Sequence, residues 1–220
     1  MERGSTSGSG ADRTLILYVN NLSVSRSPIP LKSMARGRTT DSLKFGLTMG
    51  RSMAIIRDLA GADVACIPEV LGGPAWNGGL SKWSRYWEQH LSGARTCLVA
   101  QEAEKLVGYV SVVWRSQHEP FRRAGIPEIQ DLVVADFARG RGIGGALVAE
   151  CETRANDLGH AELGIGFGLY ADYGAAQRLY VRSGYVPDGL GLTWNNKSAN
   201  AGDMVRVDDD LVLWLRKRLA

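Results

Sequence analysis

The sequence predicts an α/β fold in which a mixed β-sheet is flanked by helices. Two observations predict this class: strand-like and helix-like segments alternate from residue 53 onward, and a glycine-rich segment after a buried strand opens a long helix. With 220 residues, 45% of them hydrophobic, the chain is large enough for one sizeable core. We expect one domain over residues 53–220, preceded by a leader over 1–52 that stays outside the fold.

A strand, two helices and a hairpin are expected in the first half of the domain. Leucine and tryptophan recur at spacings of three and four from Leu80 to Leu91, which predicts a helix with one apolar face. Ala103 and Glu104 separate two apolar runs and predict a tight turn. The expected elements are a strand over 53–59, a short helix over 62–71, a helix over 80–91, and strands over 96–102 and 105–114.

Strands and helices alternate in the second half, and glycines end both helices. Gly159 and Gly184 directly follow the last helical residues, a position where glycine is favoured because it adopts positive φ. Residues 189–210 are expected to form a long loop between the last two strands. The expected elements are a strand over 126–136, a helix over 143–158, a strand over 161–170, a helix over 174–183, and strands starting at 185 and 210.

The segment ARGRGIGGALVAE, residues 138–150, places four glycines where a helix is about to begin. Glycine costs about 1 kcal/mol in a helix interior, so bare backbone is needed here for another reason. The first N–H groups of a helix are unpaired and carry about half a positive charge, so they bind phosphate groups. The segment therefore indicates a ligand with a diphosphate, either a dinucleotide or coenzyme A.

Two patterns in this segment separate the two ligands. Residues 140–145 spell GxGxxG, but three strands precede them, and Glu162 stands at the start of the next strand, where a dinucleotide site needs an acidic residue at its end. The alternative pattern is Arg139-x-x-Gly142-x-Gly144. This pattern resembles the Q/R-x-x-G-x-G/A signature of the GNAT superfamily of acyl-CoA N-acyltransferases.

A second motif supports this resemblance about forty positions further along the chain. The segment AAQRLYVRSGY, residues 175–185, resembles the family's A-x-x-L-Y-x-x-x-G-F/Y segment, and it places Tyr180 at the family's catalytic tyrosine. Tyr173 stands where many relatives carry an asparagine that contacts the cofactor. The resemblance covers about residues 53–217. It implies the GNAT fold, with acetyl-CoA as cosubstrate and transfer of an acetyl group to a primary amine.

The resemblance also implies which residues act in the reaction. Tyr180 would protonate the departing thiolate, and Glu128 would deprotonate the amine, as a glutamate does in some protein-acetylating members. Asp131, expected on the opposite face of the strand by its period of two, and a water chain are left open as alternatives. The backbone N–H of Val133 or Val134, freed by a bulge in the strand, would stabilise the oxyanion.

The expected cofactor contacts come mainly from the backbone. The strand end would bind the pantetheine arm and the acetyl carbonyl, and the glycine segment would bind the diphosphate, with the arginines adding charge at its rim. These residues are Leu132, Val133, Val134, Arg139, Gly140, Arg141, Gly142, Ile143, Gly144 and Gly145.

The expected acceptor is the primary amine of a small molecule. The segments over 72–87, which holds Trp76, and over 189–210 would form the walls of its pocket. Asp208, Asp209 and Asp210 are expected to be a solvated acidic run. A protein N-terminus or lysine remains an alternative acceptor, and a non-catalytic acyl-CoA-binding module is an alternative of another class.

Net charge and cysteine content limit which other partners are expected. Residues 1–51 carry a net charge of +5, and the rest of the chain carries −2, so the domain lacks the basic surface of a nucleic-acid binder. No apolar run approaches the ~20 residues that span a bilayer. The three cysteines are scattered, without metal-ligand spacing, which is typical of a cytoplasmic protein with reduced thiols. We therefore expect no nucleic acid, membrane or metal partner, and a homodimer is left open.

Overall fold

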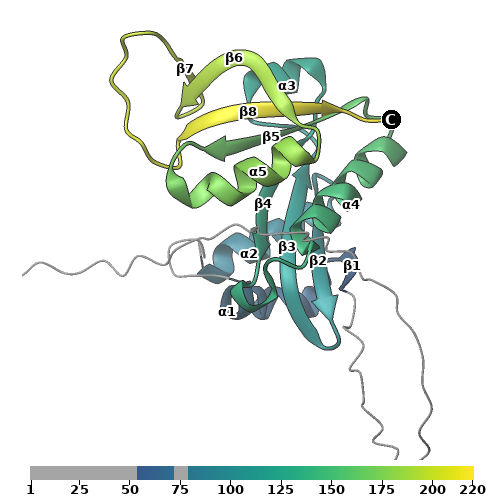
Figure 1. The fold of residues 1–220 in the computed structure, drawn as a ribbon. Coiled ribbons are helices and arrows are strands. Elements are labelled where there is room, and N and C mark those ends of the chain that lie inside the picture. Colours follow the sequence, from purple (N-terminus) through teal and green to yellow (C-terminus); the bar gives the residue numbers. More distant parts are fainter. Residues whose placement is uncertain (1–53, 72–78) are drawn as a thin grey trace, which may run out of the picture.

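A computed structural model of the protein describes residues 54–71 and 79–220. The leader expected over 1–52 and Trp76 lie outside the described residues. Eight strands form one sheet in the order β1-β2-β3-β4-β5-β8-β6-β7, with helices on both faces (Figure 1). The strands are β1 (Ile55–Asp58), β2 (Arg95–Glu102), β3 (Lys105–Val113), β4 (Glu128–Val134), β5 (Glu162–Gly168), β6 (Val186–Trp194), β7 (Lys197–Ala199) and β8 (Leu211–Arg218).

The helices include every helix expected from the sequence and one that was missed. The expected helices are present with ends that differ by a few residues. The missed helix, α3, has only six residues, too few to show a helical period. The helices are α1 (Ile67–Leu71), α2 (Gly79–Leu91), α3 (Glu119–Ala124), α4 (Ile143–Asp157) and α5 (Gly174–Arg182), with single 3-10 turns η1 (Gly61–Ala65), η2 (Asp136–Ala138) and η3 (Ala171–Tyr173).

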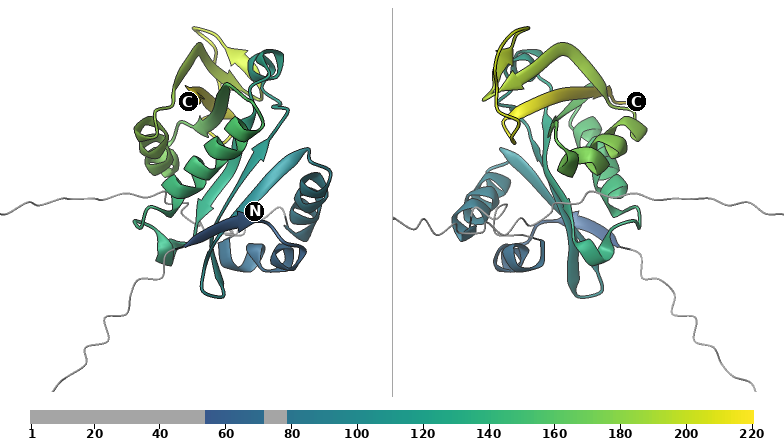
Figure 2. Two further views of the ribbon diagram at one scale, coloured as in Figure 1. Left: turned by 90° about the vertical axis from the view of Figure 1, so that its right-hand side faces the viewer. Right: turned by 60° about the vertical axis from the view of Figure 1, so that its left-hand side comes forward.

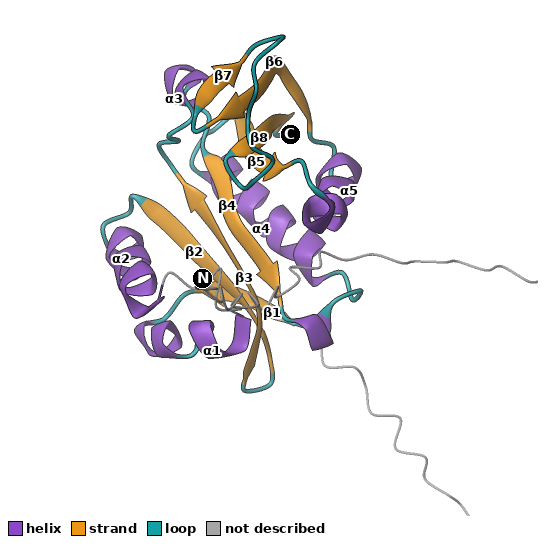
Figure 3. Cartoon of the chain, turned by 90° about the vertical axis from the view of Figure 1, so that its left-hand side faces the viewer, coloured by secondary structure: helices purple, strands orange, loops and turns teal. Residues whose placement is uncertain are grey.

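The sheet is antiparallel except where β4 meets β5. These two strands pair in parallel only at Glu128 with Gly164 and at Ile129 with Ile165. Beyond Ile129, β4 pairs with β3 alone, while β5 continues its antiparallel pairing with β8. The two halves of the sheet therefore separate along the C-terminal half of β4, and α4 crosses from one half to the other (Figure 3).

Helices cover the two faces of the N-terminal half of the sheet. The short α1 and α2 lie on one face, and α4 lies on the other (Figure 2). Trp83 of α2 is fully buried, with its ring edge-on to Tyr109 of β3 at 4.9 Å. The prediction that Leu91 belongs to the apolar face is wrong, because Leu91 is 67% exposed. Tyr86 is buried in its place, since its ring covers the buried guanidinium of Arg95 at 3.9 Å.

The long loop expected over 189–210 is wrong in its first part. The strand β6 extends to Trp194, and a hairpin leads into β7. Asn195 and Asn196 form its turn with φ values of 50° and 59°, a conformation that asparagine tolerates well in two-residue hairpins. Among the described residues, no helix is long and apolar enough to cross a membrane.

Candidate active site

A β-bulge in β4 shapes the site. The register between β3 and β4 shifts between Tyr109 and Ser111, so the bulge expected in this strand is present. Asp131 lies in it with φ +56°, a left-handed conformation that is uncommon for residues other than glycine. The bulge breaks the alternation of side chains, so the prediction that Asp131 lies on the opposite face from Glu128 is wrong. Both carboxylates line the same cavity.

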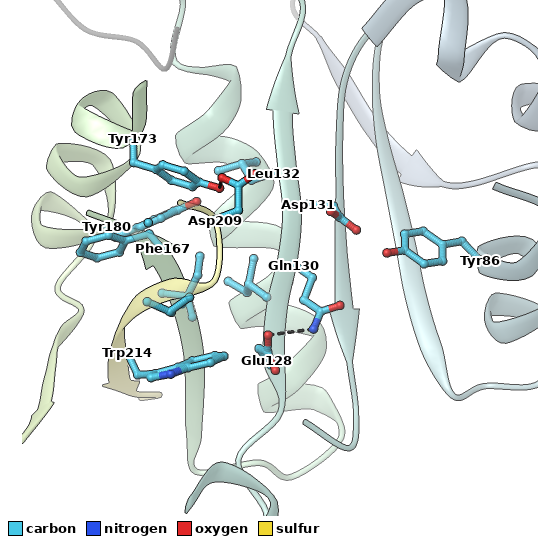
Figure 4. Close-up of a pocket in the computed structure, with 15 residues that line it drawn as sticks. Tyr86, Glu128, Gln130, Asp131, Leu132, Phe167, Tyr173, Tyr180, Asp209 and Trp214 are labelled. Carbon is cyan, nitrogen blue, oxygen red and sulfur yellow. Dashed lines mark hydrogen bonds between the residues drawn. The ribbon is translucent and has the colours of Figure 1, made fainter. Parts of the chain in front are cut away.

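This cavity has a volume of about 230 Å³ and lies where β4 and β5 separate (Figure 4). Strands β4, β5 and β8 and helices α2 and α5 contribute its walls. Glu128, Asp131, Leu132 and Tyr180, all singled out from the sequence, are among the residues that line it. Sequence positions more than fifty residues apart thus meet in one pocket.

Glu128 is buried at the start of β4 and is firmly held. The Ser116 hydroxyl donates to its Oε2 at 2.5 Å, and the Gln130 amide donates to its Oε1 at 2.8 Å. Burial raises the pKa of Glu128 above its ordinary value, although these two hydrogen bonds and the charge of Arg95 act in the opposite direction. A carboxylate with a raised pKa is suited to accept a proton near neutral pH.

Arg95 of β2 connects Glu128, through Gln130, to strand β3 and helix α2. Its guanidinium donates to Gln130 Oε1 at 3.0 Å, to Ser111 Oγ at 2.5 Å and to Gln89 Oε1 at 2.9 Å. Arg95 is 6% exposed, and none of the ion pairs among the described residues involves it. A buried cation without a carboxylate partner is costly, so this arrangement fixes a positive charge one amide away from Glu128.

Tyr180 is 5% exposed and lies on α5. Its ring packs near Phe167 of β5, with centroids 6.1 Å apart, and near Tyr185, at 6.4 Å. Among the three, Tyr180 and Phe167 line the cavity, whereas Tyr185 is buried behind them.

The N-terminus of α4 offers open backbone. Gly140 and Gly142 have φ values of +73° and +82°, and a Cβ on either would meet nothing within 4 Å. The Ala146 N–H donates to the Gly142 carbonyl at 3.0 Å, so the N–H groups of Ile143 to Gly145 precede the first bond of the helix. Gly144 differs from the other glycines, because a Cβ there would come 3.3 Å from the Leu179 side chain on α5. Its bare backbone therefore serves the packing of two helices.

The two arginines of the segment are engaged by neighbouring groups of the protein. Arg139 folds back on the strand end, donating to the Val134 carbonyl at 3.1 Å and pairing with Asp136 at 2.5 Å. Arg141 pairs with Glu102 at the end of β2, at 2.5 Å. Both charges lie beside the open amides, and Arg139 also holds the strand end in place.

Several residues of the site were not found from the sequence. Asp209 is exposed, as expected for the acidic run, and it also accepts hydrogen bonds from the hydroxyls of Tyr170 and Tyr173. Trp214 of β8 lines the cavity and stacks on His118, with centroids 4.1 Å apart. His118 lies in the loop before α3 and is 3% exposed. The aromatic and acidic residue types were the available signals, but the sequence did not show which of them would meet.

The open mixed sheet, split between β4 and β5, is the acyl-CoA N-acyltransferase fold, and solved structures share it. A ribosomal-protein-alanine N-acetyltransferase from Brucella melitensis has 24% identity and a TM-score of 0.57 over 75% of this chain and 99% of that chain. A phosphinothricin acetyltransferase from Sinorhizobium meliloti, in complex with acetyl-CoA, has 19% identity and a TM-score of 0.57 over 76% and 89% of the two chains. A spermidine/spermine N-acetyltransferase from Vibrio cholerae has 16% identity and a TM-score of 0.54 over 77% and 94%.

The sequence itself assigns the family. The model of the acetyltransferase (GNAT) family matches residues 74–185, more than half of the chain. The protein therefore belongs to the GNAT acetyltransferase family and is a transferase. A search of curated proteins found no match. The mixed and largely antiparallel sheet also rules out the dinucleotide-binding fold that the GxGxxG letters alone suggested.

Proposed function

We propose that the protein is an acetyl-CoA-dependent N-acetyltransferase that acetylates the primary amine of a small molecule. One observation carries the proposal: Glu128 and Tyr180, which come from distant parts of the chain and are the proposed proton acceptor and donor, line the same cavity between β4 and β5. The small volume of this cavity, about 230 Å³, supports a small acceptor in preference to a peptide.

The residues at the helix mouth fit the diphosphate of coenzyme A. The space at Gly140 and Gly142 that a Cβ would enter is open, and the amides of residues 143–145 lie at the start of α4, before its first hydrogen bond. Arg141 and Arg139 lie beside them. The backbone of Leu132 to Val134, which has no β5 partner, would bind the pantetheine arm and the acyl carbonyl. Acetyl-CoA supplies an acyl group activated as a thioester.

Each proton of the reaction has a proposed carrier. The amine nitrogen forms a bond to the acyl carbon, and the carbon–sulfur bond breaks. Glu128 takes the proton from the amine, and Tyr180 donates its phenolic proton to the departing sulfur. The backbone N–H of Val133 or Val134 stabilises the negative oxygen, a contribution whose loss typically costs ~10²–10³ in rate.

A thiol-release assay with acetyl-CoA across an amine library tests the proposal. E128Q should reduce kcat by about 10²–10⁴. Y180F should slow thiol release while leaving the Kd for acetyl-CoA nearly unchanged. Y185F is the matched control, since Tyr185 is buried in the core and is not among the residues that line the cavity. The assigned role of Tyr180 is refuted if Y180F and Y185F turn over equally fast.

The same assays separate the alternatives. Release of thiol with peptides but not with small amines would identify a protein acetyltransferase. Stabilisation by acetyl-CoA without turnover on any amine would identify a binding module; saturating ligand at 100 times its Kd contributes about 2.7 kcal/mol. We also propose a cytoplasmic location, which the free thiols of Cys66, Cys97 and Cys151 support.

A further inference from the structure

The cavity contains a carboxylate that the transfer reaction does not use. Asp209 precedes β8 and accepts hydrogen bonds at its Oδ1 atom from the hydroxyls of Tyr170 and Tyr173, the latter at 2.9 Å. Its Oδ2 atom accepts from neither. Asp209 is exposed, and none of the ion pairs among the described residues involves it, so its hydrogen bonds from the two phenols leave its negative charge without a basic partner. Figure 4 shows this carboxylate and Tyr173 near Leu132, while Glu128 lies at the start of β4.

Aromatic rings form part of the cavity wall, and two glycines of β5 leave the space that these rings occupy. A Cβ on Gly168 would come 2.6 Å from the Tyr173 ring, and a Cβ on Gly166 would come 2.8 Å from the Trp214 ring. Both rings can therefore lie against the strand only because these two residues are glycine. The faces of such rings attract organic cations by about 0.5–2 kcal/mol.

The charged side chains that line the cavity are all acidic. Three carboxylates, those of Glu128, Asp131 and Asp209, are among its described lining residues, and no lysine, arginine or histidine is. Lys82 pairs with Asp131 at 3.3 Å from outside the lining and offsets one of these charges. A ligand with a carboxylate or a phosphate would meet repulsion here, whereas a positively charged ligand would be attracted.

We propose that the acceptor is a small linear amine with a second, protonated amino group, which Asp209 binds beside the Tyr173 ring. The reacting amino group then faces Glu128. This inference rests on the proposed function, and the second nitrogen forms and breaks no covalent bond. Two independent features support a cation at this point: a carboxylate with no ion-pair partner among the described residues, and the Tyr173 ring, which Gly168 allows to lie against β5.

Three amines with the same four-carbon chain test this proposal: 1,4-diaminobutane, butylamine and 4-aminobutanoate. With acetyl-CoA saturating, we expect kcat/KM for the diamine to exceed that for butylamine about tenfold, well above the factor of two that two equivalent nitrogens give. 4-Aminobutanoate should react more slowly than butylamine. A diamine preference of about two in the wild type would overturn the proposal.

Two neighbouring variants locate the effect. D209N should lower the ratio of the two kcat/KM values from about ten to about two. D210N is the matched control, because it removes a charge of the same sign one residue away from a side chain that does not line the cavity. Equal effects of D209N and D210N would show a long-range charge effect and overturn the proposal.

The test also distinguishes this proposal from the proposed function. Thiol release with all three amines at similar efficiency overturns the inference and leaves the acetyltransferase assignment intact. If no amine supports thiol release, the proposed function fails. Binding of the diamine alone, measured as a saturable rise in Tm that D209N abolishes and D210N retains, then decides the inference in either direction.

Discussion

Replacing Arg95 by methionine should change both the stability of the protein and its pH profile. R95M removes the donor of three hydrogen bonds, those to Gln130, Ser111 and Gln89, and the cation over the Tyr86 ring. Each buried acceptor left unpaired costs about 1–3 kcal/mol, and the relief of burying an unpaired cation offsets part of this cost. We expect a net loss of about 2 kcal/mol, a fall in Tm of roughly 4–8 °C for a domain of this size.

The pH profile is the more specific readout. The hydrogen bonds from Arg95 to Gln130 and from Gln130 to Glu128, 3.0 Å and 2.8 Å long, span one amide, so the two charges lie about 8 Å apart or less. At an effective dielectric constant of about 20, their attraction is about 2 kcal/mol, which lowers the pKa of Glu128. Its loss should move the acidic limb of kcat/KM to higher pH by about 1.5 pH units.

A measurement of kcat/KM against pH for the wild type, R95M and R95K checks this reasoning. R95K retains the positive charge but cannot donate the same three hydrogen bonds. The acidic limb of its kcat/KM profile should therefore stay near that of the wild type while its Tm falls. An acidic limb in R95M that is unchanged, or that moves to lower pH, would refute the positioning of Glu128 by Arg95. A loss of Tm alone would then describe a purely structural residue.

Two further predictions concern the aromatic wall. G166A should displace Trp214, which is held by a 2.8 Å hydrogen bond to Thr193, and should lower the free energy of unfolding by about 1–3 kcal/mol. The KM for the amine should rise while the Kd for acetyl-CoA stays constant. An unchanged KM would contradict the role of this wall. Burial lowers the pKa of His118, with Asp188 acting in the opposite direction, so the unfolded chain binds its proton more readily. Stability should therefore fall as the pH drops below about 6.5, the unfolded value, toward the lower folded pKa. Thermal unfolding between pH 7 and 5 should show a shallower decline for H118Q, and parallel slopes would count against this account.

Features that depend on neighbouring residues were predictable from the sequence. The glycine segment and the helix it opens are local, because positive φ and unbonded amides at a helix start follow from residues 140–145 themselves. The same holds for α5 and for the turn at Ala103, where φ is 52°. The bulge in β4 was expected, but its consequence for Asp131 was not, since the extra residue reverses the alternation that the period of two predicts.

Features that depend on distant residues were not predictable. The apolar face predicted for α2 did not include Tyr86, which is buried because Arg95, on β2, lies under its ring. Asp209 meets two tyrosines more than thirty positions away, and no local pattern marks this contact. Gly166 and Gly168 read as ordinary strand residues until the rings that cover them are known.

The sequence by itself determined the family, most of the helices and strands, and the N-terminus of α4 that is proposed to bind the cofactor, because dihedral preferences and unpaired backbone groups at a helix start depend on a few neighbouring residues. Only the tertiary structure decided which side chains surround the proposed acceptor in the cavity. The walls of the cavity come from α2, β4, β5, α5 and the segment before β8, and the charge and shape of such a pocket arise from side chains that the packing of the sheet brings together.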